Sequence, residues 1–278
     1  MIFAKSVNEL SVAIERLCDR NNIGFVPTMG ALHEGHVSLV REAKKDCSHV
    51  VVSVFVNPTQ FNDPKDLQNY PRDIEKDMKL LEKEGVDIIF APGVEDVYPK
   101  KDDRLFDLNG LDKYGEGARR TGHFSGVAQV VTRLFDLVTP KKAFFGEKDF
   151  QQLSIIKYLT QSLGYPVEIV SCPTFREKDG LAMSSRNALL SDTERKEAPF
   201  IYKMIQKATS LKGNYTPQEV IEMISGEINS NTLMKCEYIE IVDSATLKPI
   251  SSWTEANDRR LCCAVFMGNV RLIDNIKI

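Results

Sequence analysis

The chain has 278 residues, of which 42% are hydrophobic and 27% charged, and this length predicts about two domains with cores that need no disulfide or metal. Lysine and arginine number 36 against 39 acidic residues, so the net charge of −3 argues against nucleic acid or an anionic membrane as a partner, although a small anionic ligand stays open. No apolar run reaches the ~18 residues of a membrane-spanning helix and the N-terminus lacks a secretion signal, so we expect a cytoplasmic protein.

Amphipathic helices and short apolar strands alternate along the first part of the chain. The spacing of apolar residues predicts helices at residues 7–17, 36–45, 74–81, 126–137 and 150–163, and strands at residues 23–26, 50–56, 86–90, 143–145 and 167–170. Continuous apolar strands between amphipathic helices are typical of a Rossmann-like, doubly wound parallel sheet, which we assign to residues 1–174.

The pattern changes at about residue 175. Helices at residues 192–211 and 217–230 are expected to precede strands at residues 238–242, 261–267 and 270–274. The expected fold class is therefore α/β, with a smaller C-terminal α+β domain over residues 175–278.

Two histidines follow the first apolar strand, in the turn PTMGALHEGH at residues 27–36. At the start of a helix, His33 and His36 would lie on one face beside exposed backbone N–H groups, which suits a phosphate. A zinc site is an alternative, but no cysteine or third histidine lies nearby in the sequence. Purely structural roles, with one histidine capping the helix and the other packed, are also open.

Polar residues follow the next strand as well. FVNPTQF at residues 55–61 places Asn57 and Gln60 beside an aromatic ring, which suits a hydroxylated ligand, although Asn-Pro is also a common turn. NYPRD at residues 69–73 leads into a helix that carries Asp77. This carboxylate could hold Mg²⁺ through water or face solvent.

Two later loops complete the set. FFGEKDFQQ at residues 144–152 offers Gly146 for close approach of a ligand to the backbone and Lys148 as a positive charge at a helix start. GLAMSSRN at residues 180–187 combines hydroxyls, a cation and an amide near the expected domain boundary, where a closing flap would be useful.

These segments, with GHFSGVAQVV at residues 122–131, resemble the pantothenate synthetase family, the pantoate–β-alanine ligases of the nucleotidylyltransferase superfamily, in order and spacing. The resemblance implies an enzyme that adenylates pantoate with ATP, releases pyrophosphate, and then joins the pantoyl group to β-alanine with release of AMP. It also implies Mg²⁺ together with ATP, and a homodimer. Because pantoate is already ionised at neutral pH, its adenylation needs alignment and relief of charge but no catalytic base.

The resemblance carries residue roles onto this sequence. It implies catalytic roles for His33, His36 and Lys148, which would stabilise developing charge. It implies contacts with ATP for Met29, Gly30, His33, His36, Gly146, Lys148, Asp149, Met183, Ser184, Ser185 and Arg186. It implies contacts with pantoate for Asn57, Gln60, Tyr70, Arg120 and Gln152, and a place near Mg²⁺ for Asp77. No residue is marked as a base for the amine of β-alanine, and Thr121 stands where the family leads us to expect proline.

Three other functions remain as alternatives. A nucleotidyltransferase that acts on a phosphorylated alcohol shares the histidine turn, and so does a class I aminoacyl-tRNA synthetase. The synthetase should carry a Lys-Met-Ser-Lys-Ser flap and a basic RNA-binding domain, whereas this chain has MSSR at residues 183–186 and a negative net charge. A nucleotide-binding regulatory module without activity would be expected to lose the histidines or Lys148, and this sequence keeps them.

Overall fold

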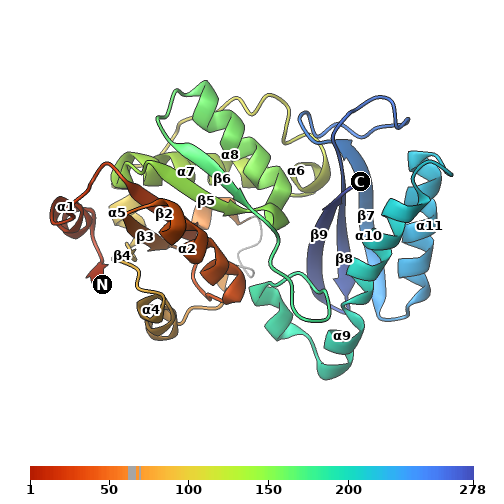
Figure 1. Cartoon of the computed structure of the whole chain (residues 1–278), viewed down its shortest axis with the longest axis horizontal. Helices are drawn as coiled ribbons and strands as arrows, with labels where there is room; N and C mark the ends of the chain where they lie inside the picture. Colours follow the sequence, from red (N-terminus) through yellow and green to blue (C-terminus); the bar gives the residue numbers. More distant parts are fainter. Residues whose placement is uncertain (62–66, 69) are drawn as a thin grey trace. The chain divides into compact units, whose positions relative to one another are not determined.

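The computed structural model describes residues 1–61, 67–68 and 70–278 (Figure 1). The chain divides into two compact units. Unit 1 comprises Met1–Leu108, Arg120–Glu147 and Gln152–Pro173, and unit 2 comprises Asn109–Arg119, Lys148–Gln151 and Thr174–Ile278. The chain thus leaves unit 1 twice to form a short segment of unit 2, and each time it returns to unit 1.

Unit 1 is built on a six-stranded sheet in the order β1-β4-β3-β2-β5-β6, in which every pair of neighbouring strands is parallel. The strands are β1 (Ile2–Ala4), β2 (Ile23–Thr28), β3 (His49–Val54), β4 (Ile88–Phe90), β5 (Lys142–Gly146) and β6 (Glu168–Cys172). The β-branched run in β3 is almost wholly buried, as expected for a central parallel strand covered on both faces.

The strand order reverses at β2. From this strand the chain proceeds outward through β3 and β4 on one side, and later through β5 and β6 on the other. In open α/β sheets, ligands bind beyond the carboxyl ends of the strands at such a switch point. The loops that follow Thr28 and Gly146 therefore occupy the favoured position for a ligand in unit 1.

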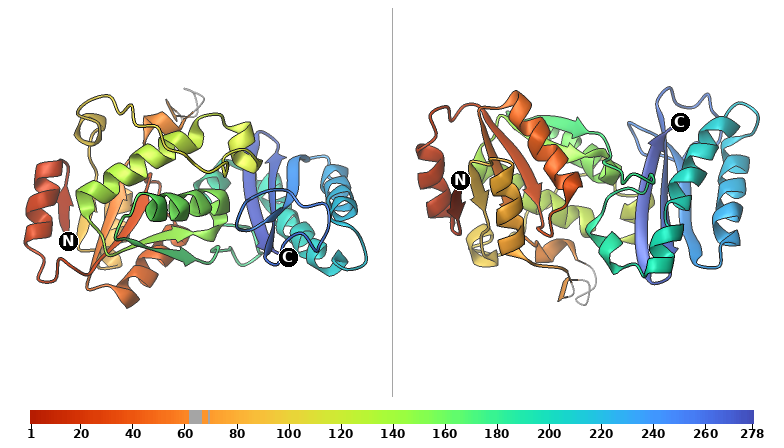
Figure 2. Two further views of the ribbon diagram at one scale, coloured as in Figure 1. Left: turned by 90° about the horizontal axis from the view of Figure 1, so that it is seen from above. Right: turned by 60° about the horizontal axis from the view of Figure 1, so that its bottom comes forward.

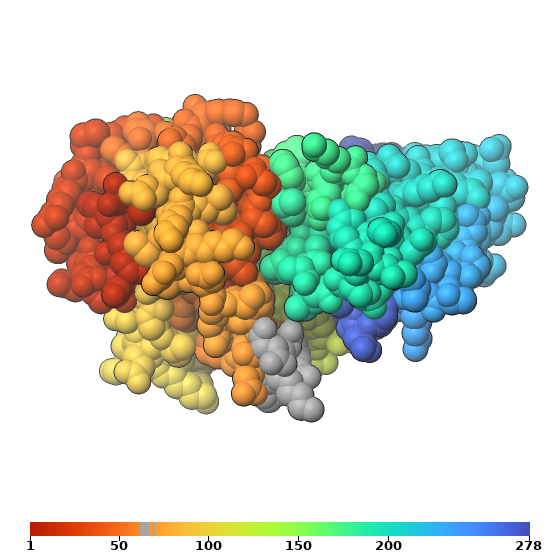
Figure 3. Space-filling model, turned by 90° about the horizontal axis from the view of Figure 1, so that it is seen from below, coloured from red at the N-terminus to blue at the C-terminus, as the bar shows by residue number. Residues whose placement is uncertain are grey.

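Helices cover both faces of this sheet (Figures 1 and 2). On one face, residues of α2 (Glu34–Asp46) and α4 (Ile74–Lys83) share a buried cluster with alternate strand residues such as Val26 and Val52. On the other face, the ring of Phe135 in α7 (His123–Val138) meets Phe25 of β2 at 6.4 Å between ring centroids, and α1 (Val7–Glu15) packs beside α7. Further helical segments of this part of the chain are η1 (Pro58–Gln60), α5 (Val94–Val97), η2 (Glu147–Asp149) and α8 (Phe150–Ser162). The segment Lys148–Gln151, which includes the end of η2 and the start of α8, belongs to unit 2. The space-filling view shows α4 and the N-terminal segment on one surface of unit 1 (Figure 3).

Unit 2 contains a three-stranded antiparallel sheet in the order β7-β8-β9. Its strands are β7 (Met234–Asp243), β8 (Arg259–Met267) and β9 (Val270–Lys277), and its helical segments are α6 (Gly115–Arg119), η3 (Ser185–Leu189), α9 (Asp192–Glu197), α10 (Phe200–Leu211) and α11 (Pro217–Ser230). The helices α10 and α11 lie side by side on one face of the sheet and bury a shared apolar core with it (Figure 2).

Buried charges tie α6 to this sheet. The carboxylate of Glu116 accepts hydrogen bonds from both terminal nitrogens of Arg271, at 2.9 and 2.8 Å, and from the hydroxyl of Tyr238 at 2.9 Å. Paired, hydrogen-bonded groups of this kind are the form in which charges can be buried. The segment Asn109–Arg119 therefore belongs to unit 2 although unit 1 flanks it in the sequence.

The predicted fold class is confirmed, with differences of detail. The edge strand β1 was not predicted, because three residues are too short for a periodic signal. The single helix expected over residues 192–211 is two helices, α9 and α10, which are separated at Ala198 and Pro199. Proline lacks the N–H that would continue the first helix. Within the described ranges, no helix combines the length and the apolar character needed to cross a membrane.

Candidate functional site

The loop after β2 turns through left-handed backbone conformations. Gly30 and Ala31 have φ angles of 82° and 51°. For alanine this conformation costs about 1–2 kcal/mol, so the surrounding structure must hold it in place. The hydroxyl of Thr28 gives part of this support, since it accepts the N–H of Gly30 at 3.2 Å and donates to the carbonyl of Ser53 at 2.7 Å.

Asp77 supplies the rest of the support from α4. Its two carboxylate oxygens accept the N–H groups of Ala31 and Leu32, at 3.0 and 2.8 Å. The residue is only 2% exposed, and burial raises the pKa of Asp77 while the two backbone hydrogen bonds lower it. A Cβ on Gly30 would lie 3.0 Å from the same carboxylate, so the loop and the side chain fit closely.

The expected place of Asp77 near Mg²⁺ stays a prediction. Each of its oxygens accepts one backbone N–H, which leaves further lone pairs for a water molecule that binds the ion. Among residues 1–61, 67–68 and 70–278, no group of three or more His, Cys, Asp or Glu side chains could hold a metal ion. The zinc alternative at the histidine turn therefore finds no complete ligand set in the described part of the chain.

The two histidines form a reciprocal cap at the start of α2. Nδ1 of His33 accepts the N–H of Gly35 at 3.1 Å, and Nδ1 of His36 accepts the N–H of His33 at 3.3 Å. The two rings lie 4.1 Å apart between centroids. Because both Nδ1 atoms act as acceptors, each neutral imidazole carries its proton on Nε2 and presents an N–H donor there.

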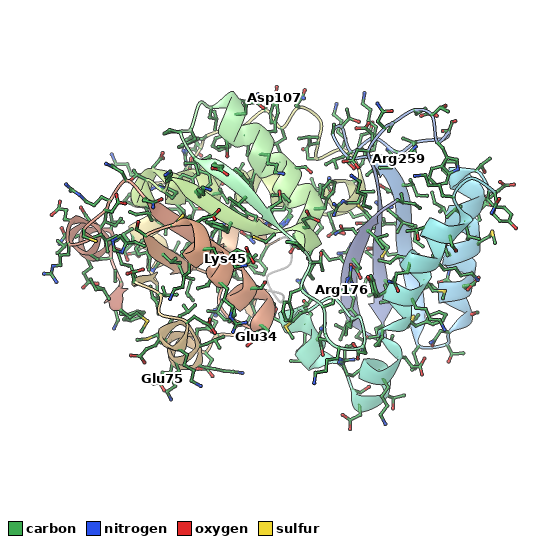
Figure 4. The ribbon with its side chains drawn as sticks, viewed as in Figure 1. Glu34, Lys45, Glu75, Asp107, Arg176 and Arg259 are labelled. Atoms are coloured by element: carbon green, nitrogen blue, oxygen red, sulfur yellow. The ribbon has the colours of Figure 1, made fainter. Side chains whose placement is uncertain are left out.

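Both histidines thus take part in the cap, whereas the structural alternative had one capping and the other packed. The phosphate role stays a prediction. The rings lie at the positive end of a helix of 13 residues, whose first residue is Glu34 (Figure 4). Two oriented N–H donors at a helix N-terminus can stabilise negative charge on a phosphate without themselves carrying a full charge.

Gln60 lies beside the loop after β2. Its Nε2 donates to the sulfur of Met29 at 3.0 Å, and its Oε1 accepts from Nδ2 of Asn57 at 3.2 Å. Asn57 is 1% exposed, and its side chain also donates to the carbonyl of Gly126 and accepts from the hydroxyl of Tyr98. Asn57 thus orients the amide of Gln60, and its own contact with pantoate stays a prediction.

His123, to which the sequence assigned no role, links Arg120 to the backbone of Gln60. Nδ1 of His123 lies 2.8 Å from the carbonyl oxygen of Gln60, and its Nε2 lies 3.0 Å from a terminal nitrogen of Arg120. Since a carbonyl only accepts, Nδ1 carries the proton and Nε2 accepts from the guanidinium. The signal in the sequence was a histidine at the start of a helix, three residues after an arginine.

The other expected residues of unit 1 are half-buried. The ring of Tyr70 packs edge-on against Phe61 at 5.7 Å, next to Gln60 in the chain. Asn69, which belongs to the same motif, lies outside the described residues. A Cβ on Gly146 would find no described atom within 4 Å, so the backbone at the end of β5 is open to a ligand. Gln152 lies in the first turn of α8.

In unit 2, the backbone of Lys148 is held by β9. The side chain of Asn275 donates to the carbonyl of Lys148 at 2.9 Å. The Lys148 side chain is only 19% exposed, and its Nζ lies 3.8 Å from the carboxylate of Asp149, which is 48% exposed. The lysine is thus an oriented cation, whereas Asp149 faces solvent.

Contacts with neighbouring residues support the serine-rich loop of unit 2, at residues 180–187. Arg176 (Figure 4) donates to both oxygens of Asp274, at 2.7 and 2.9 Å, and stacks on the ring of Tyr202. The hydroxyl of Ser184 accepts the N–H of Arg186 at 3.2 Å and begins η3. Met183, Ser184, Ser185 and Arg186 are all half-buried.

A small pocket in unit 2 brings Lys148 and Ser184 together. Its lining consists of Lys148, Leu181, Ala182, Ser184, Asn187, Ile201, Leu272, Ile273 and Asp274. Asn187 donates to Glu177 at 2.9 Å and to the carbonyl of Ala182 at 3.2 Å, while its buried Oδ1 has no hydrogen-bond partner within the part of the chain that the structure describes. A buried acceptor of this kind is suited to a donor on a ligand.

The structure thus groups the expected residues within each unit. In unit 1 it joins Met29, Asn57 and Gln60, pairs His33 with His36, and ties the loop after β2 to Asp77. In unit 2 it joins Lys148 to Ser184. His123 and Asn187 are the additional residues that the geometry points to.

Comparison with known proteins identifies relatives over nearly the whole chain. The family model described as pantoate-beta-alanine ligase matches residues 2–277. A pantothenate synthetase from Christiangramia forsetii is 50% identical over 262 residues, which are 94% of this chain and 93% of the relative. One from Porphyromonas gingivalis is 49% identical over 259 residues, with coverage of 93% and 92%.

Solved structures agree with these sequence relatives. The crystal structure of pantothenate synthetase from Thermus thermophilus has a TM-score of 0.91 at 43% identity and covers 100% of this chain and 99% of its own. The pantoate-beta-alanine ligase from Francisella tularensis, complexed with beta-gamma ATP and beta-alanine, has a TM-score of 0.82 at 36% identity, with coverage of 100% and 97%.

Proposed function

The chain belongs to the pantoate-beta-alanine ligase family, and we propose that the reciprocal pair His33 and His36 is the feature of unit 1 on which its use of ATP depends. The reaction of this family is the ATP-dependent ligation of pantoate and β-alanine to pantothenate, through a pantoyl adenylate, with release of AMP and pyrophosphate. This chain is an enzyme of that kind.

In the first step, the ionised carboxylate of pantoate attacks the α-phosphorus of ATP and pyrophosphate leaves. Negative charge grows on the phosphoryl oxygens as this happens. The Nε2–H groups of His33 and His36 are proposed to donate to such oxygens, which is supported by the backbone hydrogen bonds that both Nδ1 atoms accept. Met29 and Gly30 in the preceding loop, and Gly146 at the end of β5, are assigned to the nucleotide by their place at the switch point.

The polar residues of unit 2 are assigned to ATP as well. Lys148 supplies a positive charge, and Ser184, Ser185 and Arg186 supply hydroxyl and guanidinium donors, which are the groups that bind phosphate oxygens. Arg176, which pairs with Asp274, also donates to the carbonyl of Gly180, and this contact supports the start of their loop. Asp149 and Met183 are kept as contacts of the nucleotide on the resemblance alone.

For pantoate, we assign Gln60, Gln152, Asn57, Tyr70 and Arg120. Gln60 has support from its position, since its amide is oriented by Asn57 and its backbone is linked through His123 to Arg120. In the second step, the amine of β-alanine attacks the acyl carbon of the adenylate and AMP leaves. The adenylate is reactive enough for alignment of the neutral amine to supply much of the rate.

Mg²⁺ is proposed to enter with ATP, bound by phosphate oxygens and water, as is usual for this ion. Asp77, whose oxygens each accept one backbone N–H, would lie near the ion and contact it through water. A homodimer and a cytoplasmic location are retained as proposals from the family resemblance and the composition. Sedimentation of the purified chain would measure the oligomeric state.

The decisive experiment follows AMP and pyrophosphate released from ATP and Mg²⁺, first with pantoate alone and then with pantoate and β-alanine. Equal amounts of AMP, pyrophosphate and pantothenate, formed only with both acids present, are the expected result. Binding of ATP without turnover would contradict the assignment, and turnover with a different acid would correct the substrate.

A further inference from the structure

A cysteine, a histidine and an aspartate meet at the edge of the parallel sheet where the strands begin. Cys18 follows α1, His49 is the first residue of β3, and Asp87 directly precedes β4. Sγ of Cys18 lies 3.2 Å from Nε2 of His49, and Nδ1 of His49 lies 3.1 Å from Oδ1 of Asp87. The loops assigned to ATP in unit 1 follow the opposite ends of the strands, so this cluster is separate from them.

The aspartate determines which nitrogen of His49 carries the proton. An ionised carboxylate only accepts hydrogen bonds, so Nδ1 of His49 donates to Asp87 and Nε2 keeps its lone pair. The thiol of Cys18 then donates to Nε2. The other oxygen of Asp87 accepts the N–H of Val50 at 2.8 Å, which fixes the carboxylate against β3. A nucleophile, a base and a group that orients the base are thus aligned.

The segment that carries Cys18 is fixed to the start of β3. Asn22 donates to the hydroxyl of Ser48 at 2.9 Å, and this hydroxyl donates to the carboxylate of Asp19 at 3.1 Å. The N–H of Ser48 also donates to the carbonyl of Asn22 at 3.1 Å. These hydrogen bonds fix the loop that carries Cys18, so the contact between its thiol and the imidazole of His49 is part of the fold.

Exposure distinguishes Cys18 from the cysteines of the cores. Cys18 is exposed, whereas Cys172 and Cys263 are buried and pack against apolar neighbours. The His49 side chain is 13% exposed, so the base is shielded while Cys18 itself is exposed. Packing alone would not require an exposed cysteine whose sulfur points at a base.

We propose that Cys18 is a nucleophilic thiol, activated by His49 and Asp87, that is covalently modified by soft electrophiles and by low-molecular-weight disulfides. With a haloacetamide, the S–C bond forms as the carbon–halogen bond breaks, halide leaves, and the thiol proton passes to Nε2 of His49. With a small disulfide, Sγ bonds to one half and becomes oxidised, and the other half leaves as a thiol with that proton. The imidazolium formed in between is stabilised by Asp87.

The test measures alkylation of the full-length chain by limiting iodoacetamide at pH 7, with the rate constant of each cysteine resolved by mass spectrometry. Cys172 and Cys262 serve as internal references, because burial raises the pKa of these thiols to about 11 and about 12. Cys18 is expected to react before every other cysteine and several-fold faster than N-acetylcysteinamide. His49→Gln is expected to slow Cys18 by about tenfold, because it removes the base but keeps a hydrogen-bonding side chain.

The Asp87→Asn variant and the rates of the other cysteines serve as controls. Asp87→Asn should slow Cys18 less than His49→Gln does, and both variants should keep the rates of Cys172 and Cys262 unchanged if they fold as wild type does. A wild-type Cys18 that reacts no faster than N-acetylcysteinamide overturns the proposal, whether or not the variants fold. So does an unchanged rate in a folded His49→Gln protein.

Discussion

The carboxylate of Asp77 accepts the backbone N–H of Leu32 at 2.8 Å, and through this contact α4 holds the loop that carries the histidine pair. Asp77→Asn would leave one of the two N–H groups of the loop facing an amide nitrogen. We expect this substitution to lower the free energy of unfolding by about 1–3 kcal/mol, as measured by urea unfolding. Glu75→Gln is the matched control, because Glu75 lies exposed on the same helix (Figure 4) and should change stability by less than about 0.5 kcal/mol.

The stability difference between wild type and Asp77→Asn should also depend on pH. Burial raises the pKa of Asp77 above the ordinary value of 3.8, so the folded chain binds this proton more tightly than the unfolded chain. The stabilisation by the proton is complete below 3.8 and is lost as the pH rises through the raised pKa. The unfolding free energy of wild type minus that of Asp77→Asn should therefore fall as the pH rises from about 4 and then level off. A difference that grows with pH would contradict the assigned direction.

His36→Ala removes one of the two Nε2–H donors at the start of α2. Its expected effect is a decrease of about 10²–10³-fold in the rate of pyrophosphate release, which is typical for loss of one donor to a transition state. Lys45→Ala, at the far end of the same helix (Figure 4), should leave that rate unchanged. If His36→Ala kept a rate within a few-fold of wild type while folding normally, His36 would have no part in the chemistry.

Gln60→Ala tests the assignment of pantoate to the residues beside Met29. The variant should raise KM for pantoate by about tenfold or more, because a polar group meant for the substrate is lost, while the Kd for ATP changes less than about threefold. Steady-state kinetics and calorimetric titration with ATP measure the two quantities. A loss of ATP affinity equal to the loss of pantoate use would show that the pantoate pocket lies elsewhere.

Sequence patterns predicted the parts of this molecule that depend on local periodicity. The alternation of apolar strands and helices indicated the parallel sheet, and the turn at residues 27–36 indicated a helix start with two histidines on one face, as found. The contacts of Asp77 with Ala31 and Leu32 could not be predicted, because they join residues about 45 positions apart through backbone N–H groups that leave no trace in side-chain pattern. No pattern in the sequence therefore showed that the fold uses this carboxylate as an anchor.

Contacts between residues far apart in the sequence also explain why the roles of Glu116 and His123 were not predicted. Glu116 joins α6 to strands more than 120 residues later, and no periodic signal marks such a pairing. His123 lay within a recognised motif, yet its role depends on the carbonyl of Gln60 being 2.8 Å away. The link from Arg120 through His123 to Gln60 can be seen only once η1 and α7 are known to lie side by side.

A pair of glycine substitutions tests whether close packing of α7 against η1 shapes the pantoate region. A Cβ at Gly126 would lie 2.4 Å from the backbone carbonyl oxygen of Thr59, which cannot move without displacing Gln60. Gly126→Ala should therefore cost about 1–3 kcal/mol of stability and also raise KM for pantoate.

Gly226→Ala is the matched helical control, because in α11 the added Cβ would find no described atom within 4 Å. It should raise stability by about 0.5–1 kcal/mol, since alanine favours the helix over glycine, and leave KM for pantoate unchanged. Thermal unfolding and steady-state kinetics of both variants give the comparison. Equal stabilisation by the two substitutions would show that α7 and η1 are not in contact as described, because only that contact makes the alanine at residue 126 unfavourable.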